Sequence, residues 1–234
     1  MSAMCGRYQS NLPKEALARI FNAIPSFDVQ TIRYNAAPTQ LLPVVRYDPK
    51  AQERTLDLLR WGLIPHWTKD LKIANTLINA RVETAVTKPA FREAFKSRRC
   101  LVPAAGFYEW KASRIGTKHP YSIAPRDAPV FAFAGLWENW MNPADGHSVR
   151  TFAIITGSSN SLMADLHNRM PVILDGMLWP AWLGEDEMTP AELEKMIAEP
   201  YPSQLMTAHP VSTRVNNVRN DDAGLIEPEQ TAPR

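Results

Sequence analysis

The chain has 234 residues, and its 26 Lys and Arg against 24 Asp and Glu give a formal net charge of +2. Hydrophobic residues make up 45% and charged residues 21%, which is ordinary for a folded globular protein and excludes a disordered or fibrous chain. The weak positive balance permits a nucleic-acid partner without requiring one, so any basic surface must be local. Because the sequence has no long uncharged apolar window and no signal-peptide pattern, we expect no membrane span and a cytoplasmic protein, nucleoid-associated when it binds DNA.

Helix signals appear first near the N-terminus and again near residue 87. Asn11 can cap a helix whose first turn holds Pro13 and whose apolar face includes Leu17. Thr87, followed by Pro89, can begin a second helix in the same way.

The pattern changes to short strands in the middle of the chain. These segments are rich in Val, Ile, Phe and Tyr and are separated by Pro, Gly or Asp: 100–102, 106–110, 121–123, 130–136 and 151–156. Asp145 and Gly146, in a polar stretch between two of them, fit a hairpin connection. Since strands and helices do not alternate regularly, we expect an α+β single domain with a mostly antiparallel, curved or barrel-like β core flanked by helices.

The third helix signal is the clearest. Thr189 as N-cap, Pro190 in the first helical position and Glu192 three residues after the cap form a capping box, and Pro200 ends the helix. Trp179 and Trp182, three residues apart, are expected on a helix face packed against the core.

Two cysteines are too few for a disulfide framework, so we expect Cys5 and Cys100 to be free thiols, with Cys100 a small buried side chain in its strand. His66, His119 and His147 lack the spacing of metal ligands, so we expect no metal site and no other cofactor.

Four polar residues inside strand-like or apolar surroundings could carry chemistry. Cys5 supplies a nucleophile, His167 a proton carrier, Glu109 an acid or base, and Asn79 a hydrogen-bonding amide. Together they suit covalent catalysis on a carbonyl. Read from the residues alone, structural roles for them remain the simpler interpretation, because the sequence does not show that they converge.

Eight ordered motifs resemble those of the SRAP family, the SOS response-associated peptidases or abasic-site processing proteins. They lie at 4–7 (MCGR), 33–38 (RYNAAP), 61–67 (WGLIPHW), 79–84 (NARVET), 106–110 (GFYEW), 167–171 (HNRMP), 209–212 (HPVS) and 215–218 (VNNV). His209 opens one of these motifs, although we can derive no role for it.

The resemblance implies a DNA damage response function and names the residues that perform it. In the family, an N-terminal cysteine forms a thiazolidine with the aldehyde of an abasic site in single-stranded DNA, and by motif position that residue is Cys5. The resemblance also implies that Glu109 handles the proton of the amine, that His167 protonates the sugar oxygen during ring opening, and that Asn79 holds the substrate. The crosslink shields the lesion.

DNA contacts are expected from four further residues. Arg7, Arg81 and Arg169 are expected to meet phosphates, and Trp67 to offer a flat face or wedge against an unstacked base. Some members of the family have a second aromatic residue after this Trp, where this chain has Thr68, so the wedge is expected to be weaker.

The start of the chain departs from the family pattern. Met1 to Met4 precede Cys5, which therefore has a peptide nitrogen and cannot form an imine until those residues are absent. We expect residues 1–4 to be an extension or removed leader, 5–226 to form the SRAP domain, and 227–234 to be a polar tail. An autopeptidase activity using Cys5 could also expose the new terminus.

Two other functions fit the same residues. A cysteine amidase or peptidase would use Cys5 and His167 on an amide and would work with an internal cysteine. A non-covalent module for single-stranded DNA would need only the arginines and Trp67. A DNA adduct that survives denaturation would indicate covalent capture and exclude the non-covalent module.

Overall fold

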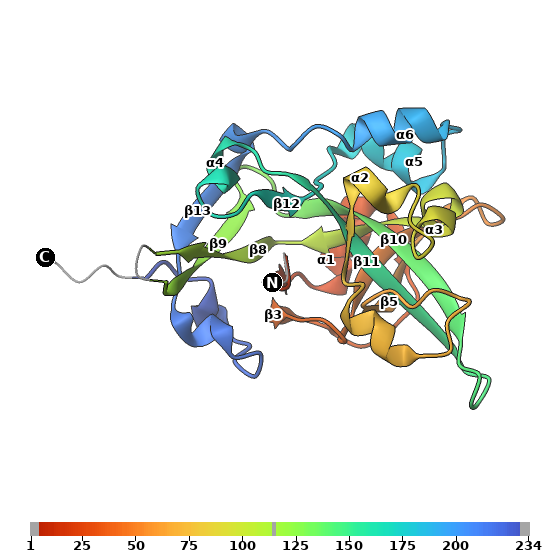
Figure 1. Cartoon of the computed structure of the whole chain (residues 1–234), viewed down its shortest axis with the longest axis horizontal. Coiled ribbons are helices and arrows are strands. Elements are labelled where there is room, and N and C mark those ends of the chain that lie inside the picture. The colour runs from red at the N-terminus through yellow and green to blue at the C-terminus, as the bar shows by residue number, and fades with distance from the viewer. Residues whose placement is uncertain (1–4, 114–115, 230–234) are drawn as a thin grey trace, which may run out of the picture.

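Five strands close on themselves into a small barrel in the computed structural model, which describes residues 5–113 and 116–229 (Figure 1). The members are β4 (Leu41–Asp48), β5 (Glu53–Trp61), β7 (Arg99–Ala104), β10 (Phe131–Met141) and β11 (Ser148–Ser158). Consecutive neighbours in the order β5, β4, β7, β10, β11 are antiparallel. A short parallel pairing of Thr151 with Arg60 and of Phe152 with Trp61 joins β11 back to β5 and closes the ring. Closure leaves these strands with few unpaired edges.

Three short strands extend this first sheet. They are β2 (Ala23–Pro25), which pairs with β5, and β6 (Asn79–Arg81) and β12 (Arg169–Pro171), which both pair with β11. The motifs at 79–84 and 167–171 therefore lie on two strands that share one partner.

A second sheet lies beside the barrel with the strand order β13, β9, β8, β1, β3, and all its pairings are antiparallel. Its strands are β1 (Tyr8–Ser10), β3 (Arg33–Ala36), β8 (Gly106–Ala112), β9 (Lys118–Pro125) and β13 (Met206–Pro210). The N-terminal strand β1 is thus held between β3 and β8.

The helices are short and lie around the sheets. They are α1 (Lys14–Phe21), α2 (Val82–Ala85), α3 (Arg92–Ser97), α4 (Ser161–Ala164), α5 (Trp179–Leu183) and α6 (Pro190–Met196), with 3-10 turns η1 (Leu71–Asn75), η2 (Gly176–Leu178), η3 (Ser203–Leu205), η4 (Thr213–Asn216) and η5 (Ala223–Leu225). Figure 1 shows α5 and α6 together at one end and η4 and η5 below β13 at the other. The architecture is the expected α+β single domain with a barrel-like core.

Large aromatic side chains fill the interior. Trp61, Trp140 and Trp182 are almost fully buried. The indole of Trp182 donates to the Cys100 carbonyl oxygen at 2.9 Å, and Trp179 stacks on Phe21 with ring centroids 4.6 Å apart. The expected packing of Trp179 and Trp182 against the core is confirmed, and so is the burial of Cys100 as a free thiol.

Two predicted helix starts are wrong. The first helix is capped by Pro13 in place of Asn11, and Pro13 has the extended backbone that its ring favours. The second predicted helix does not begin at Thr87: that segment forms turns, and α3 begins only after Phe91. In both cases the polar residue and the Pro lie in the loop before the helix. The capping box of Thr189 and Glu192 is confirmed, and the helix ends at Met196, before Pro200.

Each of the five predicted strand segments corresponds to a strand, and all five strands, β7 to β11, are longer than expected. Asp145 and Gly146 lie in the connection between these two strands, as expected for a hairpin. Part of the expected polar tail is paired: Pro228 bridges Val211, and the amide of Glu229 donates to the Pro210 carbonyl oxygen at 2.9 Å. The rest of that tail, 230–234, and residues 1–4 lie outside the described residues.

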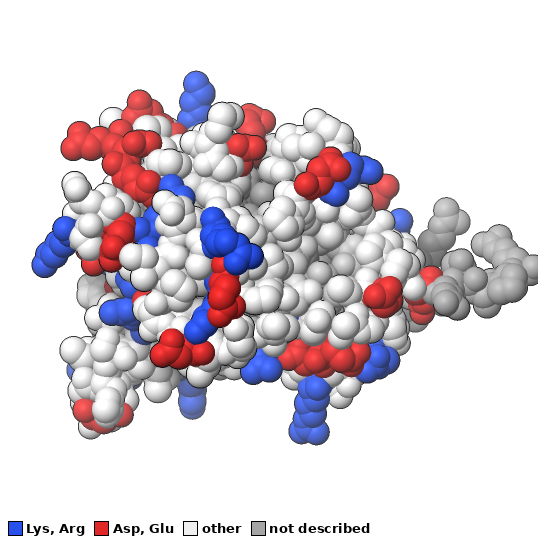
Figure 2. Space-filling view, turned by 180° about the vertical axis from the view of Figure 1, so that it is seen from behind, with Lys and Arg blue, Asp and Glu red and all other residues white. Residues whose placement is uncertain are grey.

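Charge is distributed unevenly over the surface. On the face seen in Figure 2, acidic side chains gather at the end formed by α5 and α6, while basic and acidic groups are interspersed elsewhere. No described helix is long and apolar enough to cross a membrane.

Candidate active site

Strand pairing brings Cys5 to Glu109. Tyr8 pairs with Phe107 and Gln9 with Gly106, and the amide of Tyr108 donates to the Arg7 carbonyl oxygen at 3.1 Å. Continued one step toward the N-terminus, this antiparallel register sets Glu109 opposite the residues that directly precede β1. Cys5 itself has a positive φ of 42°, so the chain turns sharply three residues before the strand begins.

The Glu109 carboxyl group is buried and accepts hydrogen bonds from the backbone N–H groups of Cys5 and Trp110. Burial raises its pKa to about 7, because the charged form loses water, while the two N–H donors and Lys118 oppose that rise. Near neutral pH this group is therefore present in both protonation states and can give or take a proton at the Cys5 nitrogen.

The Cys5 thiol is 1% exposed. Burial, and secondarily the charge of Glu109, raise the pKa of this thiol well above its usual value. The sulfur is therefore a protonated thiol at neutral pH, which differs from the low-pKa thiolates of cysteine hydrolases.

His167 follows α4 in a half-buried position. Its Nδ1 accepts a hydrogen bond from the backbone N–H of Arg169 at 3.2 Å, so in the neutral ring the proton lies on Nε2. Burial lowers the pKa of His167, and the positive charges of Lys118 and Arg169 lower it further. Since Lys118 also acts on Glu109, its ammonium lies within electrostatic reach of both candidate proton carriers.

Asn79 begins β6 and pairs with Ile154 of β11. The preceding residue, Ile78, lines a pocket of about 390 Å³ together with Gly6, Arg7, Pro38, Trp110, Lys118 and Asn216. The pocket is thus lined by Gly6, the residue that follows Cys5, and by Ile78, the residue that precedes Asn79.

The predicted DNA-binding arginines differ in what they already bind. The Arg7 guanidinium donates to Asn35 Oδ1 at 3.0 Å and to the Val215 carbonyl oxygen at 2.8 Å, yet it still lines the pocket. Arg169 forms a two-pronged ion pair with Glu83, at 2.6 and 2.9 Å. A phosphate contact by Arg169 therefore has to compete with Glu83, and its role in DNA binding stays a prediction.

Arg81 and Trp67 are the exposed members of the predicted set. Over the part of the chain that the structure describes, no carboxylate lies within 4.0 Å of the Arg81 guanidinium. Trp67 is 55% exposed on the loop between β5 and β6, which is unusual for the largest apolar side chain. Both remain available to a ligand.

Lys118 was missed by reasoning from the sequence. It lies in β9 beside the β8–β9 connection, lines the pocket and influences both Glu109 and His167. A lone Lys after a polar turn carries no motif, so no sequence signal singles it out.

The described residues bring no three His, Cys, Asp or Glu side chains together as a metal site. His209 has a structural contact, from its Nε2 to the Ile226 carbonyl oxygen at 2.9 Å.

The fold is a closed five-stranded barrel beside a second sheet. Cys5, three residues before the first strand, lies against the buried Glu109, so the class of protein is an α+β protein with a candidate covalent site. The chain belongs to the SRAP family, described as "SOS response associated peptidase (SRAP)", which matches residues 4–218.

The chain is 40% identical over 227 residues to the abasic site processing protein YoqW of Bacillus subtilis (strain 168), a match that covers 96% of this chain and 99% of that protein. It is also 31% identical over 272 residues to the abasic site processing protein HMCES of Pongo abelii, covering 96% of this chain and 76% of the relative. A crystal structure of a protein from Bacteroides thetaiotaomicron has the same fold, with a TM-score of 0.86 and 25% identity, covering 96% of this chain and all of that one.

Proposed function

We propose that this protein captures abasic sites in single-stranded DNA by bonding them covalently to Cys5. The relatives named as abasic site processing proteins, matched over nearly their full length, supply the substrate class. The observation that carries the chemistry is the hydrogen bond from the Cys5 backbone nitrogen to the buried Glu109 carboxylate. In a chain that begins at Cys5, that nitrogen is an α-amine.

The first step is attack of the neutral α-amine on the aldehyde of the ring-opened sugar, which gives a carbinolamine and then, with loss of one water, an imine. An α-amine ordinarily titrates near pH 8, so Glu109 is matched to accept its proton and to return one to the departing hydroxyl group. His167, with its neutral-state proton on Nε2, donates to the sugar ring oxygen as the ring opens. Asn79 orients the sugar or imine through its amide.

In the second step the Cys5 sulfur adds to the imine carbon, and the thiol proton goes to the imine nitrogen. The product is a five-membered thiazolidine, and the whole reaction releases one water. The raised pKa of the thiol supports this order of events, because a buried neutral thiol competes poorly with the amine for the aldehyde and then acts on the adjacent imine.

The same raised pKa argues against the cysteine amidase or peptidase alternative, which needs a thiolate. Covalent capture requires a chain that starts at Cys5, and the family match that begins at residue 4 supports such a start. We therefore propose that residues 1–4 are absent from the active form, that residues 5–226 form the SRAP domain, and that autopeptidase activity is one route to the active form.

The test is Cys5→Ala, with Cys100→Ala as the matched control at the other buried thiol. Both variants are incubated with an oligonucleotide that contains one abasic site and run on a denaturing gel. We expect the Cys100 variant to form a heat-stable adduct and the Cys5 variant to bind DNA without one, since an amine alone gives a hydrolysable imine. A heat-stable adduct with Cys5→Ala would overturn the proposal.

A further inference from the structure

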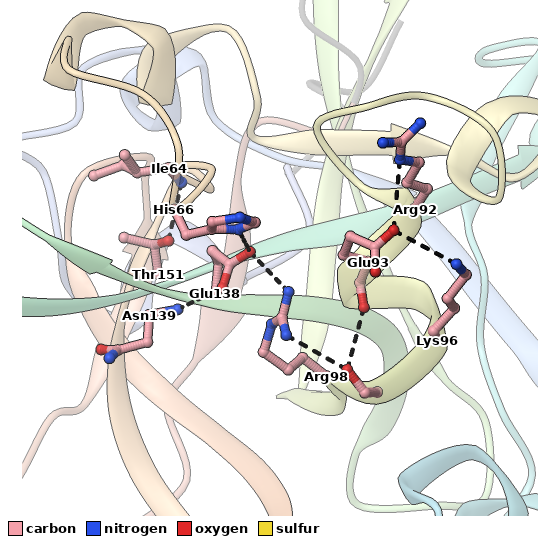
Figure 3. Close-up of polar contacts among 10 residues, drawn as sticks. Ile64, His66, Arg92, Glu93, Lys96, Arg98, Glu138, Asn139 and Thr151 are labelled. Carbon is pink, nitrogen blue, oxygen red and sulfur yellow. Dashed lines mark hydrogen bonds and ion pairs between the residues drawn. The ribbon is translucent and has the colours of Figure 1, made fainter.

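Glu138 of β10 is a buried carboxylate that no step of the proposed chemistry uses. It is 5% exposed, and its Oε2 accepts hydrogen bonds from Arg98 Nη2 at 2.9 Å and from His66 Nδ1 at 3.2 Å. Its Oε1 accepts from the backbone N–H of Asn139 at 3.0 Å. Figure 3 shows His66 and Arg98 reaching this carboxylate from two different segments, the loop after β5 and the end of α3.

The contact with Glu138 fixes which nitrogen of His66 carries a proton. A carboxylate only accepts hydrogen bonds, so the Nδ1 that faces it is the protonated nitrogen. The His66 side chain is 54% exposed, and its Nε2 has no partner among residues 5–113 and 116–229. The imidazole is thus held by a buried group on one edge and open to a ligand on the other.

The loop that carries His66 is hydrogen-bonded to the barrel both before and after His66 in the sequence. The amide of Ile64 donates to Thr151 Oγ1 at 3.0 Å, and the Trp140 indole donates to the Thr68 carbonyl oxygen at 2.8 Å. Trp67, which is 55% exposed, follows His66 in the chain and lies between the two residues that make these hydrogen bonds. Both residues are therefore exposed on a loop whose path is fixed by hydrogen bonds to the barrel before a ligand arrives, which lowers the cost of binding.

The charges around His66 favour an anion. Glu138 carries one negative charge against the positive charge of Arg98, so protonation of His66 leaves this buried cluster with an excess of one positive charge. The other charged groups are Lys69 and Asp70, which follow His66 on its own loop, and Arg92, Glu93 and Lys96 of α3, which Figure 3 shows beyond Arg98. Apart from Glu138, the only acids of this set are Asp70 and Glu93, and Glu93 is paired with Arg92 and Lys96.

We propose that His66, oriented by Glu138, binds a backbone phosphate of the DNA strand whose base lies against Trp67. Proteins that bind single strands combine aromatic side chains that stack on bases with positively charged groups that follow the backbone, and this loop offers one exposed residue of each kind. Binding uses the imidazolium form, in which Nε2–H donates to a phosphate oxygen. This inference rests on the proposed DNA function and adds to it a pH-dependent contact.

The experiment measures binding of the full chain to a single-stranded oligonucleotide without an abasic site, by fluorescence anisotropy, in a salt series at pH 6 and at pH 8. The lower pH favours the imidazolium form that the proposed contact requires. The variants are His66→Gln and, as the matched control, His147→Gln in the exposed β10–β11 connection. Glu138→Gln tests the positioning role.

We expect His66→Gln to weaken binding about two- to fivefold at pH 6, the range for one exposed ion pair, and to flatten the log-log salt slope by about 0.7. At pH 8 the affinity and salt slope of His66→Gln should equal those of the unmodified chain. His147→Gln should equal the unmodified chain in both quantities at pH 6 and at pH 8. Glu138→Gln should reduce the pH dependence, and its thermal unfolding reports whether it remains folded. Equal slopes for His66→Gln and the unmodified chain at pH 6 would overturn the inference.

A parallel reaction with abasic oligonucleotide separates this inference from the proposed function. If the unmodified chain forms the heat-stable adduct but His66→Gln binds DNA with an unchanged salt slope, only the His66 contact is wrong. If His66→Gln changes binding as expected but protein that begins at Cys5 forms no adduct, the capture chemistry is wrong and the His66 contact is still supported. No DNA binding by the unmodified chain defeats the contact outright.

Discussion

At the scale of single residues, the protonation of Glu109 links the candidate chemistry to stability. Its pKa of about 7 in the folded chain lies above the usual value for a glutamate, near 4.3, because its burial removes water. Between these pH values the folded state holds a proton that the unfolded state has lost. Stability contributed by the protonated group is therefore complete at low pH and is lost as the pH rises toward 7.

We predict that Glu109→Gln removes this dependence. Both proteins keep the residues before Cys5. The free energy of unfolding of the unmodified protein minus that of the variant should fall by about 3 kcal/mol between pH 4.5 and pH 7. Urea unfolding at several pH values measures the difference, with the exposed Glu194→Gln on α6 as control. A difference that stays constant over this pH range would show that Glu109 is not protonated by burial.

For His167, acid-base and packing roles predict opposite effects. If its Nε2 proton opens the sugar ring, His167→Ala should slow adduct formation at saturating protein by roughly 10² to 10⁴, while the midpoint of thermal unfolding changes little. His147→Ala is the control at an exposed histidine. A lowered melting temperature with an unchanged saturating rate would remove His167 from the mechanism.

At the scale of elements, the loop from Gly62 to Leu77 connects the barrel to the strand that carries Asn79. Its base is closed by hydrogen bonds from the Leu63 amide to the Leu77 carbonyl oxygen, 3.0 Å, and from the Trp61 indole to the Ile78 carbonyl oxygen, also 3.0 Å. The path of this loop depends on Gly62, which has a φ of 117° and lies so close to η1 that an added Cβ would be 2.6 Å from the Ala74 carbonyl oxygen.

Gly62→Ala should therefore displace the loop. We expect a loss of about 1 to 3 kcal/mol in stability and a weaker affinity for single-stranded DNA, because Trp67 and His66 move with the loop. The control is Gly176→Ala, where an added Cβ meets nothing within 4 Å. Chemical denaturation and anisotropy titrations check the two effects, and unchanged DNA affinity would separate the loop from DNA binding.

Local patterns predicted some elements well and others poorly. The capping box at Thr189 succeeded because all its contacts lie within four residues, as does the turn chemistry of Asp145 and Gly146. Asn11 and Thr87 failed as helix caps because the Pro residues that follow them were compatible with a loop as well as with a first turn.

At the scale of the whole molecule, the candidate site depends on pairings between distant parts of the chain. The four catalytic candidates could be named from motifs, but the approach of Cys5 to Glu109 results from the pairing of β1 with β8, about 100 residues away. The ion pair of Arg169 with Glu83 and the contact of His66 with Glu138 are equally non-local. Neither periodicity nor spacing contains that information.

In the proposed mechanism, Cys5 captures an abasic site through both its amine and its sulfur. The most direct measurement is the intact mass of the adduct formed with an abasic oligonucleotide. We expect a protein component that begins at Cys5 and a total mass one water less than the sum of the two reactants. An adduct whose protein component retains residues 1–4 would contradict this mechanism, because the nitrogen of Cys5 would then be a peptide nitrogen that cannot form the imine.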